Sequence, residues 1–193
     1  MGRYAVCKRC ADLVFSVILL VLLALPMGLI ALSVALTSRG GILFRQVRVG
    51  RGEEPFVCYK FRTMRKDAPK NCPSSSMRDR DRWLTPVGRF LRQTSLDELP
   101  QLFNVLKGNM SLVGPRPLIP CEERVHELRR RYGVDRIRPG ITGLAQVCGR
   151  DELDDRKKAA MDARYLRHMG FSEDTKILCL TLLRVVKRKG VRE

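Results

Sequence analysis

The feature that most limits how this chain can fold is an uncharged apolar run over residues 13–36. Leu, Val, Ile and Ala dominate it, and its length meets the requirement of about 20 apolar residues for a membrane helix. A cleavable signal peptide has a shorter apolar region, of about 7–15 residues, so that explanation is disfavoured. The run therefore predicts that the protein lies on or in a membrane.

Pro26 lies in the middle of this run, where it removes one backbone hydrogen bond and clashes with the carbonyl four residues earlier. A break at Pro26 leaves two limbs, residues 13–25 and 27–36, which are roughly 20 Å and 15 Å long and so shorter than a hydrocarbon core of about 30 Å. Basic residues flank both ends of the run, so the positive-inside rule names no translocated side. The residues alone leave two arrangements open: a kinked spanning helix, or a helix-break-helix that enters and leaves by the cytoplasmic face.

The chain as a whole is strongly basic, with 37 Lys and Arg against 20 Asp and Glu and a formal net charge of +17. Such a field attracts polyanions, including nucleic acid, anionic lipid headgroups and phosphorylated substrates. A membrane-tethered nucleic-acid-binding protein is the alternative from another class, but aromatic residues are few and no binding module is recognisable. The seven cysteines are scattered, and the single CxxC at Cys7 and Cys10 lacks a second pair, so reduced thiols are favoured over a zinc site.

One compact domain is expected after the apolar run. The 193 residues suffice for an anchor over residues 1–38 and a catalytic domain over 39–193. Residues 42–48 and 55–63 alternate in character around a Gly-rich turn and predict a β-hairpin, while residues 65–82 are polar and predict a surface loop. Helical patterns are expected at 86–93, 96–106, 122–132, 151–167 and 172–187, with Gly- and Pro-rich stretches at 107–120 and 133–149. The predicted fold class is α+β and mostly α, with a small β-hairpin and several amphipathic or surface helices.

Two adjacent acids, Asp97 and Glu98, stand among the arginines of residues 84–117. A carboxylate near a helix N-terminus can attack phosphorus to give an acyl phosphate, which divides one displacement into two easier ones. The structural alternative is a capping box, because Ser95 and Glu98 have its spacing and Glu98 would then only satisfy backbone N–H groups. Pro100 weakens that alternative, since it would lie just past the first turn. Asp97 is therefore a candidate nucleophile.

Attack on a phosphoryl group requires neutralisation of its charge by Arg, Lys and a divalent metal held by few carboxylates and several waters. The candidate cations lie in or beside turns from which they can converge. They are Lys60, Arg62, Arg89, Arg92, Arg116 and Arg138. For any one of these residues the alternative is a solvated or lipid-facing charge, because basic residues are abundant throughout the chain.

Five segments carry a family resemblance: FRQVRVG, YKFRTM, LTPVGRFLR, SLDELPQLFNVLKGNMSLVGPRPL and RPGITGLAQVCGR. Together they resemble the bacterial sugar transferase family of monotopic polyprenyl-phosphate phosphoglycosyl transferases, in its minimal form. The resemblance runs from Lys8 to nearly the end of the chain. It implies a re-entrant membrane helix broken at Pro26, within one membrane-associated domain at the cytoplasmic face of the bacterial cell membrane.

The resemblance also implies roles for individual residues. Asp97 is expected to be the nucleophile and to hold Mg²⁺, with Glu98 assisting. Substrate-phosphate contacts are expected at Lys60, Arg62, Arg89, Arg116 and Arg138, and Asp162 matches an acidic position placed in the same group.

The reaction implied is transfer of a sugar-1-phosphate from a UDP-sugar to polyprenyl (undecaprenyl) phosphate. UMP is released, and the reaction passes through a covalent aspartyl phospho-sugar. This would be the first membrane step of glycoconjugate or polysaccharide biosynthesis. The expected partners are the two substrates and membrane lipids, without nucleic acid, and a homodimer in the membrane plane is compatible with this picture.

Overall fold

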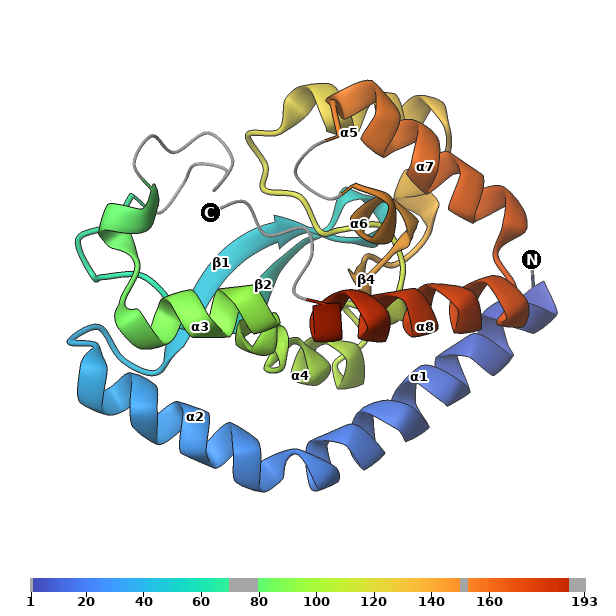
Figure 1. Cartoon of the computed structure of the whole chain (residues 1–193). Coiled ribbons are helices and arrows are strands. Elements are labelled where there is room, and N and C mark those ends of the chain that lie inside the picture. Colours follow the sequence, from blue (N-terminus) through green and yellow to red (C-terminus); the bar gives the residue numbers. More distant parts are fainter. Residues whose placement is uncertain (1, 70–79, 150–152, 188–193) are drawn as a thin grey trace.

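Two helices form an open V along one edge of the molecule (Figure 1). They are α1 (Gly2–Leu22) and α2 (Ala24–Thr37), and they are bent by 64° at their junction. The computed structural model describes residues 2–69, 80–149 and 153–187. Within these ranges no single helix has the length and apolar character needed to cross a bilayer, and only the bent pair taken together meets that criterion.

The break between α1 and α2 lies at Leu23 rather than at Pro26, where the sequence predicted it. Leu23 has φ −97° and ψ 5°, outside the helical region. Pro26 lies in the first turn of α2, where its missing N–H would have had no intrahelical partner. The proline ring opposes continuation of α1 because it would clash with the carbonyl of Leu22. Pro26 therefore explains the bend but is displaced from it by part of a turn.

The predicted β-hairpin is confirmed. Strands β1 (Leu43–Val49) and β2 (Pro55–Phe61) pair antiparallel, from Leu43 opposite Phe61 to Val49 opposite Pro55. The connecting turn contains η1 (Arg51–Glu53), in which Gly52 takes a φ of 66° that glycine adopts without strain. The inward side chains of β2, Phe56 and Cys58, form a core cluster with Val105 and Met110.

Four predicted helices are found close to their expected bounds: α3 (Pro86–Thr94), α5 (Glu123–Arg131), α7 (Asp155–His168) and α8 (Phe171–Lys187). The helix expected over 96–106 is divided into η4 (Leu96–Glu98) and α4 (Gln101–Leu106), with Pro100 at the boundary. In the predicted loop 65–82, residues 70–79 lie outside the described ranges. The short helix η3 (Arg80–Trp83) lies at the end of this loop. Met64 and Leu84, which flank the loop, form an isolated antiparallel bridge.

A parallel strand pair lies in the two Gly- and Pro-rich stretches. Strand β3 (Ser111–Val113) pairs with β4 (Gly140–Thr142), and the second stretch also contains η5 (Val134–Arg136) and α6 (Leu144–Cys148). The backbones approach so closely that a Cβ on Gly140 would lie 2.1 Å from the backbone nitrogen of Gly114. Strands this short carry too little alternation to be recognised from sequence.

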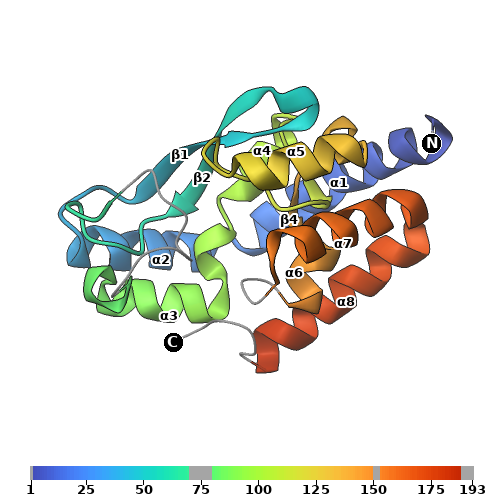
Figure 2. The ribbon, with the colours of Figure 1, turned by 90° about the horizontal axis from the view of Figure 1, so that it is seen from above.

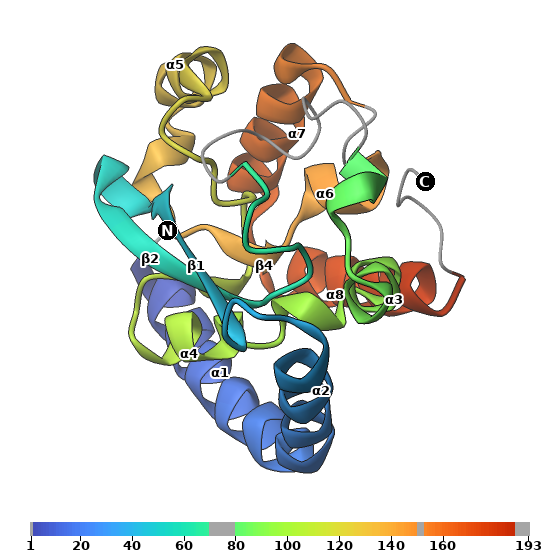
Figure 3. The ribbon, with the colours of Figure 1, turned by 90° about the vertical axis from the view of Figure 1, so that its left-hand side faces the viewer.

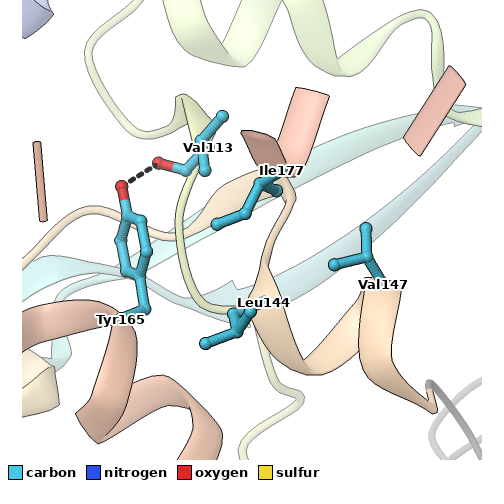
Figure 4. Packing of buried hydrophobic residues seen from close by; sticks show 5 residues of the cluster. All are labelled: Val113, Leu144, Val147, Tyr165 and Ile177. Carbon is cyan, nitrogen blue, oxygen red and sulfur yellow. Dashed lines mark hydrogen bonds between the residues drawn. The ribbon is translucent and has the colours of Figure 1, made fainter. Parts of the chain in front are cut away.

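The core cluster behind this pair joins β3, α6, α7 and α8 (Figure 4). It contains Val113, Leu144, Val147, Tyr165 and Ile177. The Tyr165 hydroxyl, although buried, donates to the carbonyl of Val113 at 3.2 Å. Seen from above, the hairpin and α8 lie on opposite sides of the molecule, with α6 between them (Figure 2).

Polar contacts attach the first half of α1 to the rest of the domain. The Tyr4 hydroxyl and Lys8 Nζ both donate to Asp174 on α8, at 2.7 and 2.6 Å. Asp12 accepts hydrogen bonds from the Ser111 hydroxyl at 2.7 Å and from the Leu112 N–H at 3.2 Å. The apolar second half of α1 and the whole of α2 then continue along the edge seen at the bottom of Figure 3.

Candidate functional site

The Asp97 and Glu98 dyad lies in η4, at the corner between α3 and α4, and both residues are buried. Ser95 precedes this turn in the left-handed conformation, with φ 57°. In this described turn the Ser95 side chain makes no capping hydrogen bond, so the capping-box alternative is not supported. Instead, Glu98 Oε1 accepts a hydrogen bond from Lys60 Nζ at 2.6 Å.

Glu98 is the point at which three distant segments meet. Lys60 comes from β2, and Arg116 comes from the loop after β3. Arg116 Nη1 lies 3.6 Å from the same Glu98 oxygen that binds Lys60. One carboxylate therefore holds two cations in position, and the group keeps a positive charge suited to an anionic ligand.

A small cavity adjoins this group. Its lining includes Arg48, Cys58, Lys60, Glu98, Arg116 and Gln146. Burial raises the pKa of the Cys58 thiol, which keeps it in the protonated, non-nucleophilic form. Glu98 is the dyad residue that lines this cavity, and the cations around it are suited to bind phosphate.

Three of the predicted phosphate-binding arginines are placed elsewhere in the fold. Arg62 Nε donates to the Gly41 carbonyl at 2.9 Å, which fixes the connection between α2 and β1. Arg138 Nε donates to the Gly108 carbonyl at 2.8 Å, and burial lowers the pKa of this arginine. Arg89 lies on the exposed side of α3. Of the described residues that line the cavity, none is Arg62, Arg89 or Arg138.

Asp162 was expected to contact substrate phosphate, but the structure gives it a different environment. Its side chain is 1% exposed, and its Oδ2 accepts from Arg129 Nε and Nη2 at 2.9 and 2.6 Å. Arg129 Nη1 in turn donates to the backbone carbonyl of Arg116 at 2.8 Å. Burial raises the pKa of Asp162, and the Arg129 guanidinium opposes that shift. Asp162 thus positions the Arg116 loop through Arg129.

Sequence reasoning missed both Arg129 and Arg48. Arg129 stands in a run of three arginines that has the composition of a solvated helix face, yet it is buried on the same side of α5 as Val125. The i,i+4 spacing of these two residues was the available signal. Arg48 was not among the predicted phosphate-binding residues, although it lies in the segment FRQVRVG, and its inward position follows from the register of the hairpin.

The residues present fit a magnesium ion of the type that proteins hold loosely. Within the described part of the chain no group of three or more His, Cys, Asp or Glu side chains could bind a metal. Mg²⁺ needs only one or two carboxylates when substrate phosphates and water complete its coordination. The dyad supplies two neighbouring carboxylates for such an ion, Asp97 and Glu98, of which Glu98 also binds Lys60.

Comparisons with known proteins place nearly the whole chain beside one group of enzymes. The sequence model of a family described as bacterial sugar transferase matches residues 3–188. The chain is 42% identical to an undecaprenyl-phosphate glucose phosphotransferase of Komagataeibacter xylinus, over 93% of this chain and 36% of that protein. It is 40% identical to the uncharacterized sugar transferase EpsL of Bacillus subtilis, over 96% of this chain and 90% of that protein. It is also 40% identical to a UDP-glucose:undecaprenyl-phosphate glucose-1-phosphate transferase of Klebsiella pneumoniae, over 95% of this chain and 41% of that protein. The chain thus spans well under half of the Komagataeibacter and Klebsiella proteins and most of the Bacillus protein.

The Asp162→Asn variant tests the buried pair. Removing the carboxylate charge leaves Arg129 buried without its counter-ion, which costs on the order of 3–5 kcal/mol. The variant should therefore melt at a markedly lower temperature. The exposed pair Arg65 and Asp67 supplies the matched control, because Asp67→Asn breaks an ion pair in high dielectric and should leave the melting temperature unchanged. Equal melting of the two variants would contradict the assignment.

Proposed function

Because the chain belongs to the bacterial sugar transferase family, we propose that it transfers a sugar-1-phosphate from a UDP-sugar to undecaprenyl phosphate and releases UMP. The relatives' names state this kind of acceptor, and several state UDP-glucose as the donor. The observation that carries the proposal is the buried Asp97 and Glu98 dyad, with Lys60 and Arg116 held on one Glu98 oxygen. The product begins a membrane-bound glycoconjugate or polysaccharide.

In the first step an Asp97 carboxylate oxygen attacks the β-phosphorus of the donor. The bond between that phosphorus and the oxygen bridging to the α-phosphate breaks, and UMP leaves with the electron pair. The sugar phosphate remains on Asp97 as an acyl phosphate. In this scheme Lys60 and Arg116 neutralise the negative charge on the phosphoryl oxygens, and Glu98, which contacts both, orients them.

In the second step a phosphate oxygen of undecaprenyl phosphate attacks the same phosphorus. The bond to the Asp97 oxygen breaks, the carboxylate is regenerated, and undecaprenyl-diphospho-sugar is formed. Burial of the dyad supports this scheme, because excluding water protects the acyl phosphate from hydrolysis. A magnesium ion held by Asp97 and the donor phosphates would supply additional neutralisation of charge.

The proposed location is the cytoplasmic face of the cell membrane, with α1 and α2 as a re-entrant anchor. Large apolar side chains on the V are more than half exposed, as expected of a lipid-contacting surface. They include Val21, Leu22, Leu25, Leu29, Leu32 and Leu36. Residues 13–22 of α1 are roughly 15 Å long and α2 roughly 21 Å, both shorter than a hydrocarbon core of about 30 Å.

The attachment of both ends of the V supports re-entry over spanning. The start of α1 bonds to Asp174 on α8 through Tyr4 and Lys8. The far end of α2 packs Val34 in one cluster with Phe61 and Leu91 of the same domain. A helix that crossed the bilayer would leave its two ends on opposite sides, whereas these two ends contact one folded unit.

The covalent step is tested by intact-protein mass. Incubation with a reactive UDP-sugar and no acceptor should add the mass of one phospho-sugar to the wild type. Asp97→Asn should gain no mass and release no UMP, because an amide is a poor nucleophile at this position. Asp67→Asn, at an exposed acid, is the control that should label like the wild type. Labelling of Asp97→Asn would rule out this residue as the nucleophile.

The metal requirement is tested by chelation. UMP release should fall at least tenfold after EDTA treatment and recover when Mg²⁺ is added back, because Mg²⁺ neutralises phosphoryl charge in such reactions. A turnover that stays the same with and without chelator would remove the metal from the mechanism. Asp97→Glu, which keeps the carboxylate and moves it, should raise the Mg²⁺ concentration needed for any residual activity.

Membrane attachment is tested by flotation with vesicles that contain phosphatidylglycerol. The wild type should float with the vesicles, and the double variant Leu25→Asp and Leu29→Asp should remain in the dense fraction, because charges in the hydrocarbon region are costly. Tyr132→Asp changes an exposed ring just after the end of α5, away from the V, and should float like the wild type. Flotation of the double variant would exclude the V as the membrane contact.

A further inference from the structure

We propose that Arg48 is a further substrate-binding residue of this site and that its guanidinium contacts the diphosphate of the nucleotide-sugar donor. The proposal rests on the function proposed above and extends it to a residue outside the predicted phosphate-binding set. Arg48 lies on β1 and lines the same cavity as Lys60, Glu98 and Arg116.

Both terminal nitrogens of Arg48 make hydrogen bonds, but its Nε does not. Its Nη1 donates to the Pro117 carbonyl at 3.0 Å, and its Nη2 donates to Gln46 Oε1 at 2.6 Å. Its Nε is buried and has no hydrogen-bond partner. Buried polar groups are nearly always paired, so this donor beside the cavity is suited to an acceptor there, from a ligand oxygen or a water.

Among the described residues no carboxylate lies within ion-pair distance of Arg48, although Glu98 and Glu122 favour its charge from further away. Lys60 and Arg116 share Glu98, whereas Arg48 takes part in no ion pair with the residues that the structure describes. Burial lowers the pKa of Arg48 to about 10, and repulsion by the nearby Arg116 charge adds to this shift. Arg48 therefore remains charged at neutral pH. A phosphate group in the cavity would supply the missing negative charge.

The orientation of Arg48 is fixed before any ligand arrives. The contact with Pro117 places the guanidinium beside the loop that carries Arg116, and Val49 continues this attachment by donating its N–H to the Leu118 carbonyl at 2.9 Å. A planar guanidinium held in this way loses little conformational freedom on binding. Arg48 is therefore preorganised for an oxyanion.

The same cavity contains an orphaned acceptor. Gln146 Nε2 donates to the Ile141 carbonyl at 2.9 Å, and its Oε1 is buried without a partner. A ligand that satisfied both side chains would carry oxyanions for Arg48 and a hydroxyl or N–H donor for Gln146. A nucleotide sugar has both kinds of group, whereas a fully ionised phosphate has only acceptors.

The experiment compares Arg48→Met with the wild type, using UDP as the probe. UDP should raise the melting temperature of the wild type, and this rise should shrink by more than half in Arg48→Met. The KM for UDP-glucose should increase about 10- to 100-fold, as expected for loss of a hydrogen bond to a charged group. Without ligand the variant should melt close to the wild type, because removal of a buried cation offsets loss of the hydrogen bond to the Pro117 carbonyl.

The controls separate binding from structure. Arg45→Met, at an exposed position on the same strand, should keep the wild-type response to UDP. Uridine should bind Arg48→Met and the wild type equally. An equal loss of uridine and UDP binding would assign Arg48 a structural role and overturn the proposal, as would an unchanged KM and UDP response.

A variant that does not fold and a wild type that does not bind UDP each have a defined consequence. If Arg48→Met does not fold, Arg48→Lys replaces it: an ammonium cannot place a donor at the Nε position, so a wild-type KM in that variant would overturn the proposal. A wild type that neither binds UDP nor releases UMP would overturn the proposed function itself, together with the role of Arg48.

Discussion

The arrangement of the site depends on one carboxylate oxygen. Glu98 Oε1 binds Lys60 at 2.6 Å and lies 3.6 Å from Arg116, so it joins the hairpin, the η4 turn and the loop after β3. Two cations placed side by side repel each other, and Glu98 offsets that repulsion at low dielectric. Glu98 therefore organises the charge at this corner of the fold, and in the proposed mechanism its neighbour Asp97 is the nucleophile.

A second layer of charged groups holds the first in place. Asp162 fixes Arg129, Arg129 holds the carbonyl of Arg116, and Arg48 holds the next carbonyl at Pro117. The loop between β3 and α5 is thereby anchored from both sides by guanidinium groups. A preorganised loop matters for phosphoryl transfer, because catalysis there consists mostly of positioning and charge neutralisation.

The membrane segment and the site are joined by the same fold. Asp12 on α1 binds Ser111 and Leu112 of β3, the strand that leads to Arg116. The residues that precede the apolar run therefore belong structurally to the catalytic unit. An acceptor whose phosphate lies at the headgroup level would meet a site held at a fixed depth relative to the V.

The amino-acid sequence by itself determined the local features of this protein. Period-2 alternation predicted the hairpin, helical periodicity and proline predicted most helices and the existence of a bend, and the adjacent acids predicted the dyad. It failed for β3 and β4, since three-residue strands have no usable period, and it placed the bend at Pro26 instead of Leu23.

Only the tertiary structure decided which charges act together. Lys60 and Glu98 are 38 positions apart in the sequence, yet they form an ion pair. Asp162 and Arg129 are 33 positions apart and pair in the core. Arg62 and Arg138, in contrast, donate to backbone carbonyls and do not line the cavity. In a chain with 37 Lys and Arg, composition offers far more cations than one site can use. Burial and contacts between distant segments select among these cations, because a charged side chain is held in place only where folding excludes water and supplies a partner.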